Sequence, residues 1–213
     1  MAGMLSNYRV FVKQFFRRYH TTGAILPSGR PLANALCRYV REGDATGPRE
    51  ILEVGPGSGA VTERLVRLLR PEDRLTLVEV NDDFVRHLNE RFTAEPAFKA
   101  AADRSELHHC RLEDIGGEHC YDRIVSGLPL NNFQSADVRQ ILETFARLAK
   151  PGGILSFFEY VAVRKAKRLV SGRAERERLR EIGELIGGLA EREIHRDCVI
   201  MNVTPAWVHH IQW

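Results

Sequence analysis

The chain has 213 residues, of which 44% are hydrophobic and 28% are charged, and its formal net charge is +3. This length fits one domain, and the composition allows a buried core and excludes a disordered chain. No uncharged apolar run of 18 residues occurs, so we expect no membrane-spanning helix, and we expect no secretory leader. The four cysteines are widely spaced, so we expect neither disulfides nor a zinc site, and a cytoplasmic location is the default.

The charge is unevenly distributed along the chain. Residues 1–41 contain seven Arg or Lys and no Asp or Glu, which leaves a net charge of −4 on the remainder. A cationic N-terminal segment favours an anionic partner, so nucleic acid and a membrane surface are the alternatives.

Residues 5–19 predict an amphipathic helix. At about 100° per residue, aromatic and aliphatic side chains gather on one face and basic side chains on the other. The apolar face comprises Leu5, Tyr8, Phe11, Val12, Phe15, Phe16 and Tyr19, and the basic face comprises Arg9, Lys13, Arg17 and Arg18. This pattern is typical of a helix in the interface of an anionic membrane, although a helix docked on the domain is the alternative. We therefore divide the chain into a membrane-binding helix and lid at 1–41 and a domain at 42–213.

From residue 28 on, the elements can be predicted in chain order. Ser28 is expected to cap a helix that Pro31 begins and that runs to about Arg41. The predicted strands are 50–54, 74–80, 106–111, 121–126 and 154–160, and the helices between them are 60–69, 82–92 and 134–149. This alternation predicts an α/β fold with a doubly wound, Rossmann-like parallel sheet. A basic helical insert at about 161–190 follows, and strands at about 191–203 and 207–213 form an antiparallel hairpin.

A glycine-rich loop follows the first strand. Gly55-x-Gly57-x-x-Ala60, with Glu79 about 20 residues further on, fits a dinucleotide-binding fingerprint, so a nicotinamide cofactor is one alternative. The loop also fits Glu53-x-Gly55-x-Gly57-x-Gly59. A carboxylate at the strand end suits a cationic ligand group, such as the amino group of S-adenosylmethionine, better than a pyrophosphate. After the third predicted strand, Glu113 or Asp114 can meet an adenine edge.

In combination, these residues resemble the class I S-adenosylmethionine-dependent methyltransferases over about residues 49–160. The resemblance implies that the glycine loop approaches the methionine end of the cofactor, that Glu79 binds the ribose hydroxyls, and that Glu113 or Asp114 faces the adenine. The cofactor-binding residues that it implies are Glu53, Gly55, Pro56, Gly57, Ser58, Gly59, Glu79, Val80, Glu113, Asp114, Ser126 and Gly127.

The end of the fourth strand indicates the class of acceptor. It reads Ser126-Gly127-Leu128-Pro129-Leu130. Adenine methyltransferases carry Asn/Asp-Pro-Pro-aromatic or Asn-Leu-Pro-aromatic here, in which the polar group binds the amine and the aromatic stacks on the extruded base. Gly127 and Leu130 occupy those two positions, so we expect no nucleic acid partner. An enzyme like the rRNA adenine N6-dimethyltransferases is the alternative from another class.

The same element resembles bacterial phospholipid N-methyltransferases, which convert phosphatidylethanolamine stepwise to phosphatidylcholine and whose close relatives methylate ornithine lipids. Residues 23–28 and 202–208 also resemble segments of that family, with Thr204 in place of a proline. The resemblance implies methylation of the headgroup amine of phosphatidylethanolamine or of its partly methylated intermediates, with ornithine lipid as the alternative. It also implies an enzyme bound peripherally to the inner face of the cytoplasmic membrane. A non-enzymatic cofactor-binding or scaffold protein is a weaker alternative, because the loop is complete.

The amine must lose a proton before it can attack a methyl group. For an alkyl amine with a pKa near 10, the neutral form costs about 4 kcal/mol at pH 7. His20 and Glu159 are the candidate bases. A quaternary ammonium product suits aromatic faces, for which Tyr160, Tyr19 and Trp207 are candidates.

Further residues are candidates for contact with the lipid. A lipid phosphate needs donors, and Arg18, Arg164 and Arg168 could supply them; Ser28 and Leu128 complete the predicted substrate contacts. His209 and His210 are adjacent on a predicted strand and so face opposite sides, which excludes a shared metal. We assign these two histidines no role and expect no metal.

Overall fold

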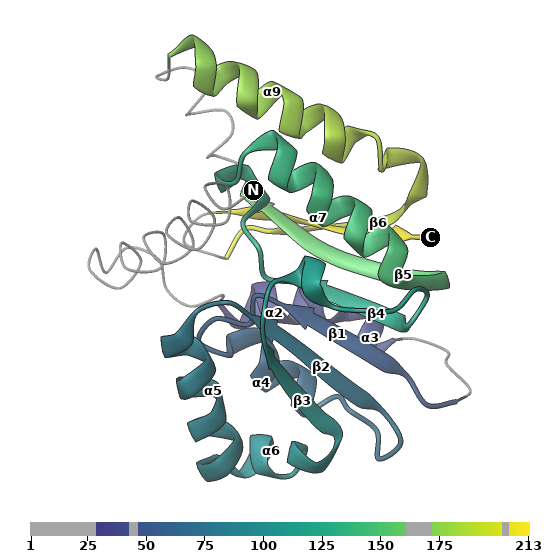
Figure 1. The fold of residues 1–213 in the computed structure, drawn as a ribbon. Coiled ribbons are helices and arrows are strands. Elements are labelled where there is room, and N and C mark those ends of the chain that lie inside the picture. Colours follow the sequence, from purple (N-terminus) through teal and green to yellow (C-terminus); the bar gives the residue numbers. More distant parts are fainter. Residues whose placement is uncertain (1–28, 43–46, 161–171, 202–204) are drawn as a thin grey trace.

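The computed structural model describes residues 29–42, 47–160, 172–201 and 205–213, and it places them in an α/β fold (Figure 1). The strands in this part of the chain form one mixed sheet in the order β3-β2-β1-β4-β5-β7-β6. They are β1 (Glu50–Val54), β2 (Arg74–Glu79), β3 (Ser105–His109), β4 (Tyr121–Ser126), β5 (Ala149–Tyr160), β6 (Glu193–Val199) and β7 (Ala206–Gln212). Strands β1 to β5 are parallel, and β7 runs antiparallel to both β5 and β6. The predicted Rossmann-like sheet and the C-terminal hairpin are thus confirmed.

Helices cover both faces of the sheet. They are α2 (Arg30–Leu36), α3 (Arg38–Arg41), α4 (Ala60–Val66), α5 (Asp82–Ala94), α6 (Pro96–Lys99), α7 (Ser135–Leu148) and α9 (Arg173–Gly187). Helices α7 and α9 pack together on one side of the sheet, and the smaller helices α2 to α6 lie on the other (Figure 1).

Each face of the sheet has its own hydrophobic core. The core under α7 and α9 includes Leu52 and Phe157 from the sheet and Ile182 from α9. The opposite core includes Ile51 and Phe158 together with apolar residues of α2, α4, α5 and α6. Because neighbouring residues of one strand enter different cores, adjacent side chains at each strand end also serve different faces.

The N-terminal helix differs from its prediction. Gly29 stands at the N-cap of α2, so the cap is not Ser28, which lies outside the described residues. The helix also does not continue to Arg41. It ends at Leu36, and after Cys37 the separate short helix α3 follows, since Cys37 has φ −88° and ψ 9°.

Other boundaries shift by a few residues. Strand β3 ends at His109 because Leu112–Asp114 form a 3-10 turn, and α4 ends at Val66 rather than at residue 69. Strand β5 begins at Ala149, before the predicted turn at 150–153, and its pairing with β4 shifts register there. Of the predicted basic insert, the structure describes only the part from residue 172, which is mainly α9. No helix of the described residues is both long and apolar enough to cross a bilayer.

Candidate active site

The glycine loop between β1 and α4 has a backbone that side chains would disturb. Gly55, Gly57 and Gly59 have φ values of 68°, 56° and 83°, in the left-handed region that glycine adopts without strain. A Cβ on Gly55 would also lie 2.7 Å from Cδ2 of Leu128. The Gly55 N–H donates to the Val78 carbonyl at 2.9 Å, which holds the loop against β2. The loop therefore presents bare backbone at the carboxyl edge of the sheet, where open α/β sheets bind their ligands.

Arg91 of α5 fixes the other end of this loop, and the sequence analysis did not identify it. Its Nη1 donates to the carbonyls of Ser58 at 2.8 Å and Gly59 at 3.0 Å. The guanidinium also pairs with Glu95 at 2.7 Å and lies 4.1 Å from the centroid of the Phe98 ring. No motif marks an arginine on this helix, so only its three-dimensional contacts reveal its part in shaping the loop.

Glu79 ends β2 directly beside the loop, as predicted. Its Oε2 accepts the Gly57 N–H at 3.1 Å, and its Oε1 accepts the N–H groups of Val80 at 2.8 Å and Asn81 at 2.9 Å. Burial raises the pKa of Glu79, and these three backbone donors oppose that shift. The carboxyl group is thus held rigidly where a ligand that lies across β1 and β2 would meet it.

Glu53 is the second-last residue of β1, and its carboxyl group is buried. The residue is 1% exposed, and its Oε2 has no hydrogen-bond partner. Burial raises the pKa of Glu53 to about 8, so the group holds a proton at neutral pH. A cationic ligand group nearby would favour its ionisation, which fits the predicted contact with an amino group.

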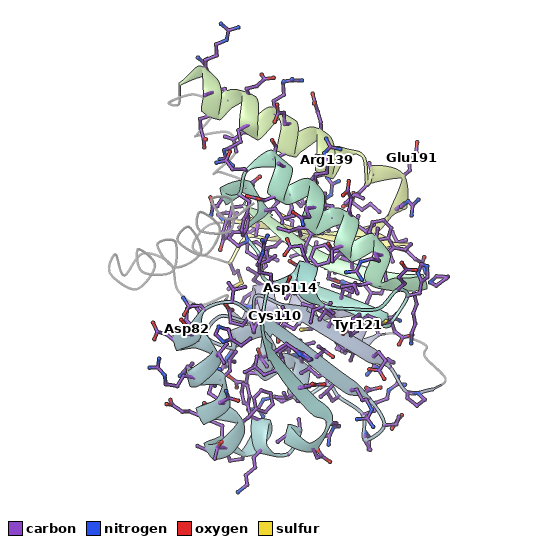
Figure 2. All side chains as sticks on the ribbon, viewed as in Figure 1. Asp82, Cys110, Asp114, Tyr121, Arg139 and Glu191 are labelled. Carbon is purple, nitrogen blue, oxygen red and sulfur yellow. The ribbon has the colours of Figure 1, made fainter. Side chains whose placement is uncertain are left out.

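Glu113 and Asp114 follow β3 on the same edge, and they differ in how they are engaged. The Oδ2 of Asp114 accepts the Arg111 N–H at 3.3 Å within the 3-10 turn, so this side chain closes its own turn. Glu113 pairs with Arg111 at 3.2 Å, but both of its carboxyl oxygens are buried without a hydrogen-bond partner. Figure 2 labels Asp114 and Cys110 after β3 and Asp82 after β2, all at one end of these strands. Of the two candidates, Glu113 has the unmet hydrogen-bonding capacity that a ligand could satisfy.

The end of β4 packs directly on the glycine loop. The Gly127 N–H donates to the Val54 carbonyl at 2.8 Å, and a Cβ on Gly127 would lie 2.5 Å from the Gly55 carbonyl oxygen. The Leu128 N–H donates to the Ser126 hydroxyl oxygen at 3.3 Å. No side chain fits at position 127 unless one of these two backbones moves.

The acceptor candidates on β5 and β7 lie on two different faces. Glu159 is directly opposite Trp207 in the sheet and shares its face, where His209 lies 3.7 Å away. Tyr160 points to the other face and packs edge-on against Phe158 at a centroid distance of 5.0 Å. The structure therefore brings Glu159 and Trp207 together but does not join Tyr160 and Trp207 into one cage across the sheet.

Several predicted residues cannot be placed. Six of them, namely Arg18, Tyr19, His20, Ser28, Arg164 and Arg168, lie outside the described residues, so their assignments stay predictions. Within the described ranges, no cluster of three or more His, Cys, Asp or Glu side chains is arranged to hold a metal ion.

Taken together, the residues of this edge fit S-adenosylmethionine. This edge carries the backbone of the glycine loop and the carboxyl group of Glu79, which the Gly57 N–H holds in place. It also carries buried carboxyl oxygens of Glu53 and Glu113 that have no hydrogen-bond partner. A carboxyl group suits ribose hydroxyls, and the open backbone allows close approach of the methionine end.

Comparisons with known sequences agree with this fit. Residues 51–153 match the family model described as a methyltransferase domain. An ornithine lipid N-methyltransferase of Singulisphaera acidiphila is 27% identical over 150 residues, which is 70% of this chain and 76% of that protein. Ribosomal RNA small subunit methyltransferase A of Parasynechococcus marenigrum is 44% identical over 97 residues, which is 45% of this chain and only 30% of that protein.

Solved structures share the fold. The 1,6-didemethyltoxoflavin-N1-methyltransferase of Burkholderia thailandensis, solved with bound 1,6-didemethyltoxoflavin and S-adenosylhomocysteine, superposes with a TM-score of 0.66 at 15% identity over 99% of this chain and 89% of that chain. The O-methyltransferase TomG of Streptomyces achromogenes, solved with S-adenosylmethionine, gives a TM-score of 0.63 at 18% identity over 95% of this chain and 88% of that chain. By its sheet order, its glycine loop and these matches, the chain belongs to the class I S-adenosylmethionine-dependent methyltransferases, with S-adenosylmethionine as its cofactor.

Proposed function

We propose that the enzyme is an N-methyltransferase that acts on the headgroup amine of a membrane lipid. The observation that carries this proposal is the packing of Gly127 on Gly55. A Cβ at position 127 would lie 2.5 Å from a backbone oxygen, so the Asn or Asp with which adenine methyltransferases bind the base amine has no room there. A flat base would also lack its stacking aromatic, because Leu130 occupies that position.

The negative charge of Glu159, at the carboxyl end of β5, supports a cationic methyl acceptor. Glu159 lies at the carboxyl end of β5, one strand from Gly127, and its side chain is 11% exposed. A carboxylate there would attract an ammonium group, whereas it would repel the phosphates of a nucleic acid. Trp207 on the same face adds an aromatic surface for a methylated ammonium.

The relatives favour the lipid over the nucleic acid. The ornithine lipid N-methyltransferase aligns over three quarters of its own length, while the ribosomal RNA methyltransferase aligns over less than a third. Of the two lipid amines that the sequence left open, ornithine lipid and phosphatidylethanolamine, this relative favours ornithine lipid. Phosphatidylethanolamine and its partly methylated forms are the second candidate.

The chain's own residues would bind and orient the two substrates. S-adenosylmethionine, when bound, supplies an electrophilic methyl group. The glycine loop, Glu53, Glu79 and Glu113 would hold it on the β1 to β3 side, and the acceptor amine would approach from the β5 side across Gly127. Glu159 would take a proton from the ammonium, so that the nitrogen keeps the electron pair with which it attacks.

We also propose that residues 5–19 bind the enzyme to the inner face of the cytoplasmic membrane. These residues lie outside the described part of the chain, so the proposal rests on their amphipathic sequence and cationic charge. Flotation with vesicles that contain anionic lipid tests it. We expect Phe15→Asp to abolish flotation without loss of the fold, and flotation equal to wild type would contradict the proposal.

Transfer of labelled methyl groups tests the substrate. The acceptors are ornithine lipid, phosphatidylethanolamine and its monomethyl form in separate mixed micelles, with ribosomal RNA as the competing acceptor. We expect label in a lipid and none in RNA, and we expect Glu79→Ala to abolish it while the exposed Glu106→Ala does not. Label in RNA alone would overturn the proposal and make the basic N-terminal segment a nucleic-acid contact.

A further inference from the structure

Two adjacent aliphatic side chains are exposed to solvent where β6 ends. Ile200 is 72% exposed and Met201 is 87% exposed, and both directly follow the strand. In the described part of the chain, the one other exposed large hydrophobic side chain is that of Ile194, at the opposite end of β6 and 43% exposed. Exposure of aliphatic surface to water is unfavourable, so the pair Ile200 and Met201, which we call the apolar tip, indicates a surface that a partner covers.

The apolar tip lies at the edge of the sheet that carries the active site. Val199, the last residue of β6, pairs with Ala206, and Ala206 pairs with Tyr160 at the carboxyl end of β5. Strand β4 is parallel to β5 and ends at the same edge, where Gly127 packs on the glycine loop. The chain therefore leaves β6 beside the carboxyl ends of β4 and β5, and a partner that covers the tip also faces the proposed acceptor side.

Arginine side chains on α9 flank the tip on one face of the sheet. The helix begins with the exposed residues Arg173 and Arg176, and its first eight residues carry four arginines and two glutamates. Arg178 donates to the backbone carbonyls of Asn131 and Phe133, which follow β4. These two contacts hold the start of α9 at the carboxyl edge of the sheet (Figure 1).

A further arginine begins α2 on the other face. Arg30 is exposed, and α2 packs against β5, β7 and β6. The chain then runs through α3 toward the opposite edge, where Arg49, directly before β1, donates to the Val40 carbonyl. The start of α2 is therefore directed toward the carboxyl edge, so basic residues from both faces lie toward the end of this edge that carries the apolar tip.

The other end of the same edge has no such excess of positive charge. After β2, α5 begins with Asp82 and Asp83, which pair with His109 and Arg86 respectively. An anionic surface would therefore be attracted to the β5 to β6 end rather than to the β2 end. Aliphatic side chains with basic residues beside them match an anionic membrane, because its headgroups attract the arginines and its acyl region accepts the aliphatic groups.

We propose that Ile200 and Met201 insert into the surface of an anionic membrane and hold this end of the active-site edge against the bilayer. This inference rests on the function proposed above, because a lipid whose acyl chains stay in the bilayer reaches Gly127 most directly when this edge faces the membrane. Residues 5–19, the proposed membrane-binding helix, precede α2 in the sequence. Two separate contacts would fix the orientation of the enzyme on the membrane, which a single helix would leave free to rotate.

The first test is binding of the full chain to vesicles made of equal parts phosphatidylglycerol and phosphatidylcholine. We expect Met201→Asp to weaken binding about tenfold, because it removes one buried aliphatic side chain and adds a negative charge. Ile194→Asp, which makes the same change in charge at the opposite end of β6, is the matched control and should bind as the wild-type protein does, as should Met201→Leu. Equal binding by Met201→Asp and Ile194→Asp would overturn the proposal.

The second test is the depth of residue 201 in the membrane. Met201→Trp is mixed with the same vesicles carrying lipids brominated in their acyl chains, which quench a nearby indole. We expect more quenching than in the wild-type protein or in Ile194→Trp, and equal quenching would overturn the insertion. Two further results would assign the tip to another partner and would also overturn it. They are a blue-shifted emission of Met201→Trp before vesicles are added, and a dimer in solution that Met201→Asp abolishes.

Neither test uses methyl transfer, so failure of this inference can be told apart from failure of the proposed function. Insertion of residue 201 without methylation of any lipid would support the membrane contact and overturn the proposed substrate. Methylation of a lipid without insertion would support the proposed substrate and overturn the membrane contact.

Discussion

The carboxyl edge of β1 to β3 and the half of the sheet formed by β5, β7 and β6 treat buried charge in opposite ways. Between β1 and β3, carboxyl groups end the strands with unmet capacity: Glu53 has an oxygen without a hydrogen-bond partner, and Glu113 has two. In the half formed by β5, β7 and β6, the polar groups satisfy one another. Asp197 accepts from Arg38 at 2.5 Å and lies 3.2 Å from His210, which in turn lies 2.8 Å from the Ser156 hydroxyl.

The contrast between the halves indicates what each is built for. A buried polar group without a hydrogen-bond partner lowers stability, so we expect such groups at sites where a bound ligand supplies the partner. A network in which every polar group has a partner stabilises the fold itself. By this criterion, the β1 to β3 half is the cofactor side, and most of the β5 to β6 half is structural. His209 is an exception in the second half, since its Nε2 has no hydrogen-bond partner while the neighbouring His210 uses both nitrogens.

The largest effect is expected for a substitution on the cofactor side, where it should lower the affinity for S-adenosylmethionine. Glu79→Ala removes the carboxyl group at the end of β2 and also releases the Gly57 N–H that it holds. Because hydrogen bonds to a charged group are each worth about 1.5–3 kcal/mol, affinity for S-adenosylmethionine should fall by at least about 100-fold. Titration calorimetry measures this, with Glu106→Ala on the exposed part of β3 as the control. An affinity within a few-fold of wild type would mean that Glu79 serves only the fold.

The structural half should instead respond to acid. Burial lowers the pKa of His210 to about 4, below the ordinary value of 6.5. Between pH 6.5 and pH 4, His210 therefore binds a proton in the unfolded chain but not in the folded chain. The contribution of His210 to stability is complete above pH 6.5 and is lost as the pH falls toward 4, by about 2–3 kcal/mol.

Urea unfolding at several pH values measures this loss. His210→Gln should flatten the fall in unfolding free energy between pH 6.5 and 4 and should leave the affinity for S-adenosylmethionine unchanged. Below pH 4 a second loss is expected in both proteins, since Arg38, which both retain, is the main cause that lowers the pKa of Asp197, to about 2 in the wild-type protein. An equally steep fall in the variant between pH 6.5 and 4 would show that another group causes it.

The cofactor half of the sheet could be predicted from the sequence because the patterns that mark its strands and loop lie within short segments of the chain. Runs of buried aliphatic residues predict β1 and β2, and the glycine spacing with Glu79 locates the loop between them. The networks of the other half were not predictable in this way. His210 meets Ser156 across 54 residues of sequence, and His209 meets Glu193 across 16. Only the order β5-β7-β6 brings these residues together, and no spacing rule encodes that order.

Ionisation of Glu53 should have a smaller effect on the free energy of unfolding, and this effect lowers stability as the pH rises. Its pKa in the folded protein is about 8, above the ordinary 4.5, so the unfolded chain loses its proton first as the pH rises. Stability is therefore highest below pH 4.5 as far as Glu53 is concerned, and it is lost progressively up to pH 8. Glu53→Gln removes this loss and should raise the unfolding free energy at pH 8 by about 2 kcal/mol. It should also weaken binding of S-adenosylmethionine, which separates Glu53 from a purely structural residue.

Thermal or urea unfolding at pH 5 and pH 8 measures whether Glu53→Gln raises or lowers the free energy of unfolding. The stabilisation by Glu53→Gln should be large at pH 8 and small at pH 5, and Glu106→Gln should change neither. A variant that is destabilised at both pH values would contradict a protonated Glu53. In that case the carboxylate would already be charged in the free protein, and the contrast between the two halves would weaken.

The smallest effect concerns the shape of the glycine loop. Arg91→Lys keeps a positive charge near Glu95 but cannot reproduce the planar guanidinium that donates to the carbonyls of Ser58 and Gly59 while it pairs with Glu95. The loop should then be less ordered before the cofactor binds, so ordering it would cost about 1.4 kcal/mol, or about tenfold in affinity. Titration calorimetry measures this change, with Arg86→Lys on the exposed side of the same helix as the control. Equal affinities would show that the three glycines hold the loop in shape without help from α5.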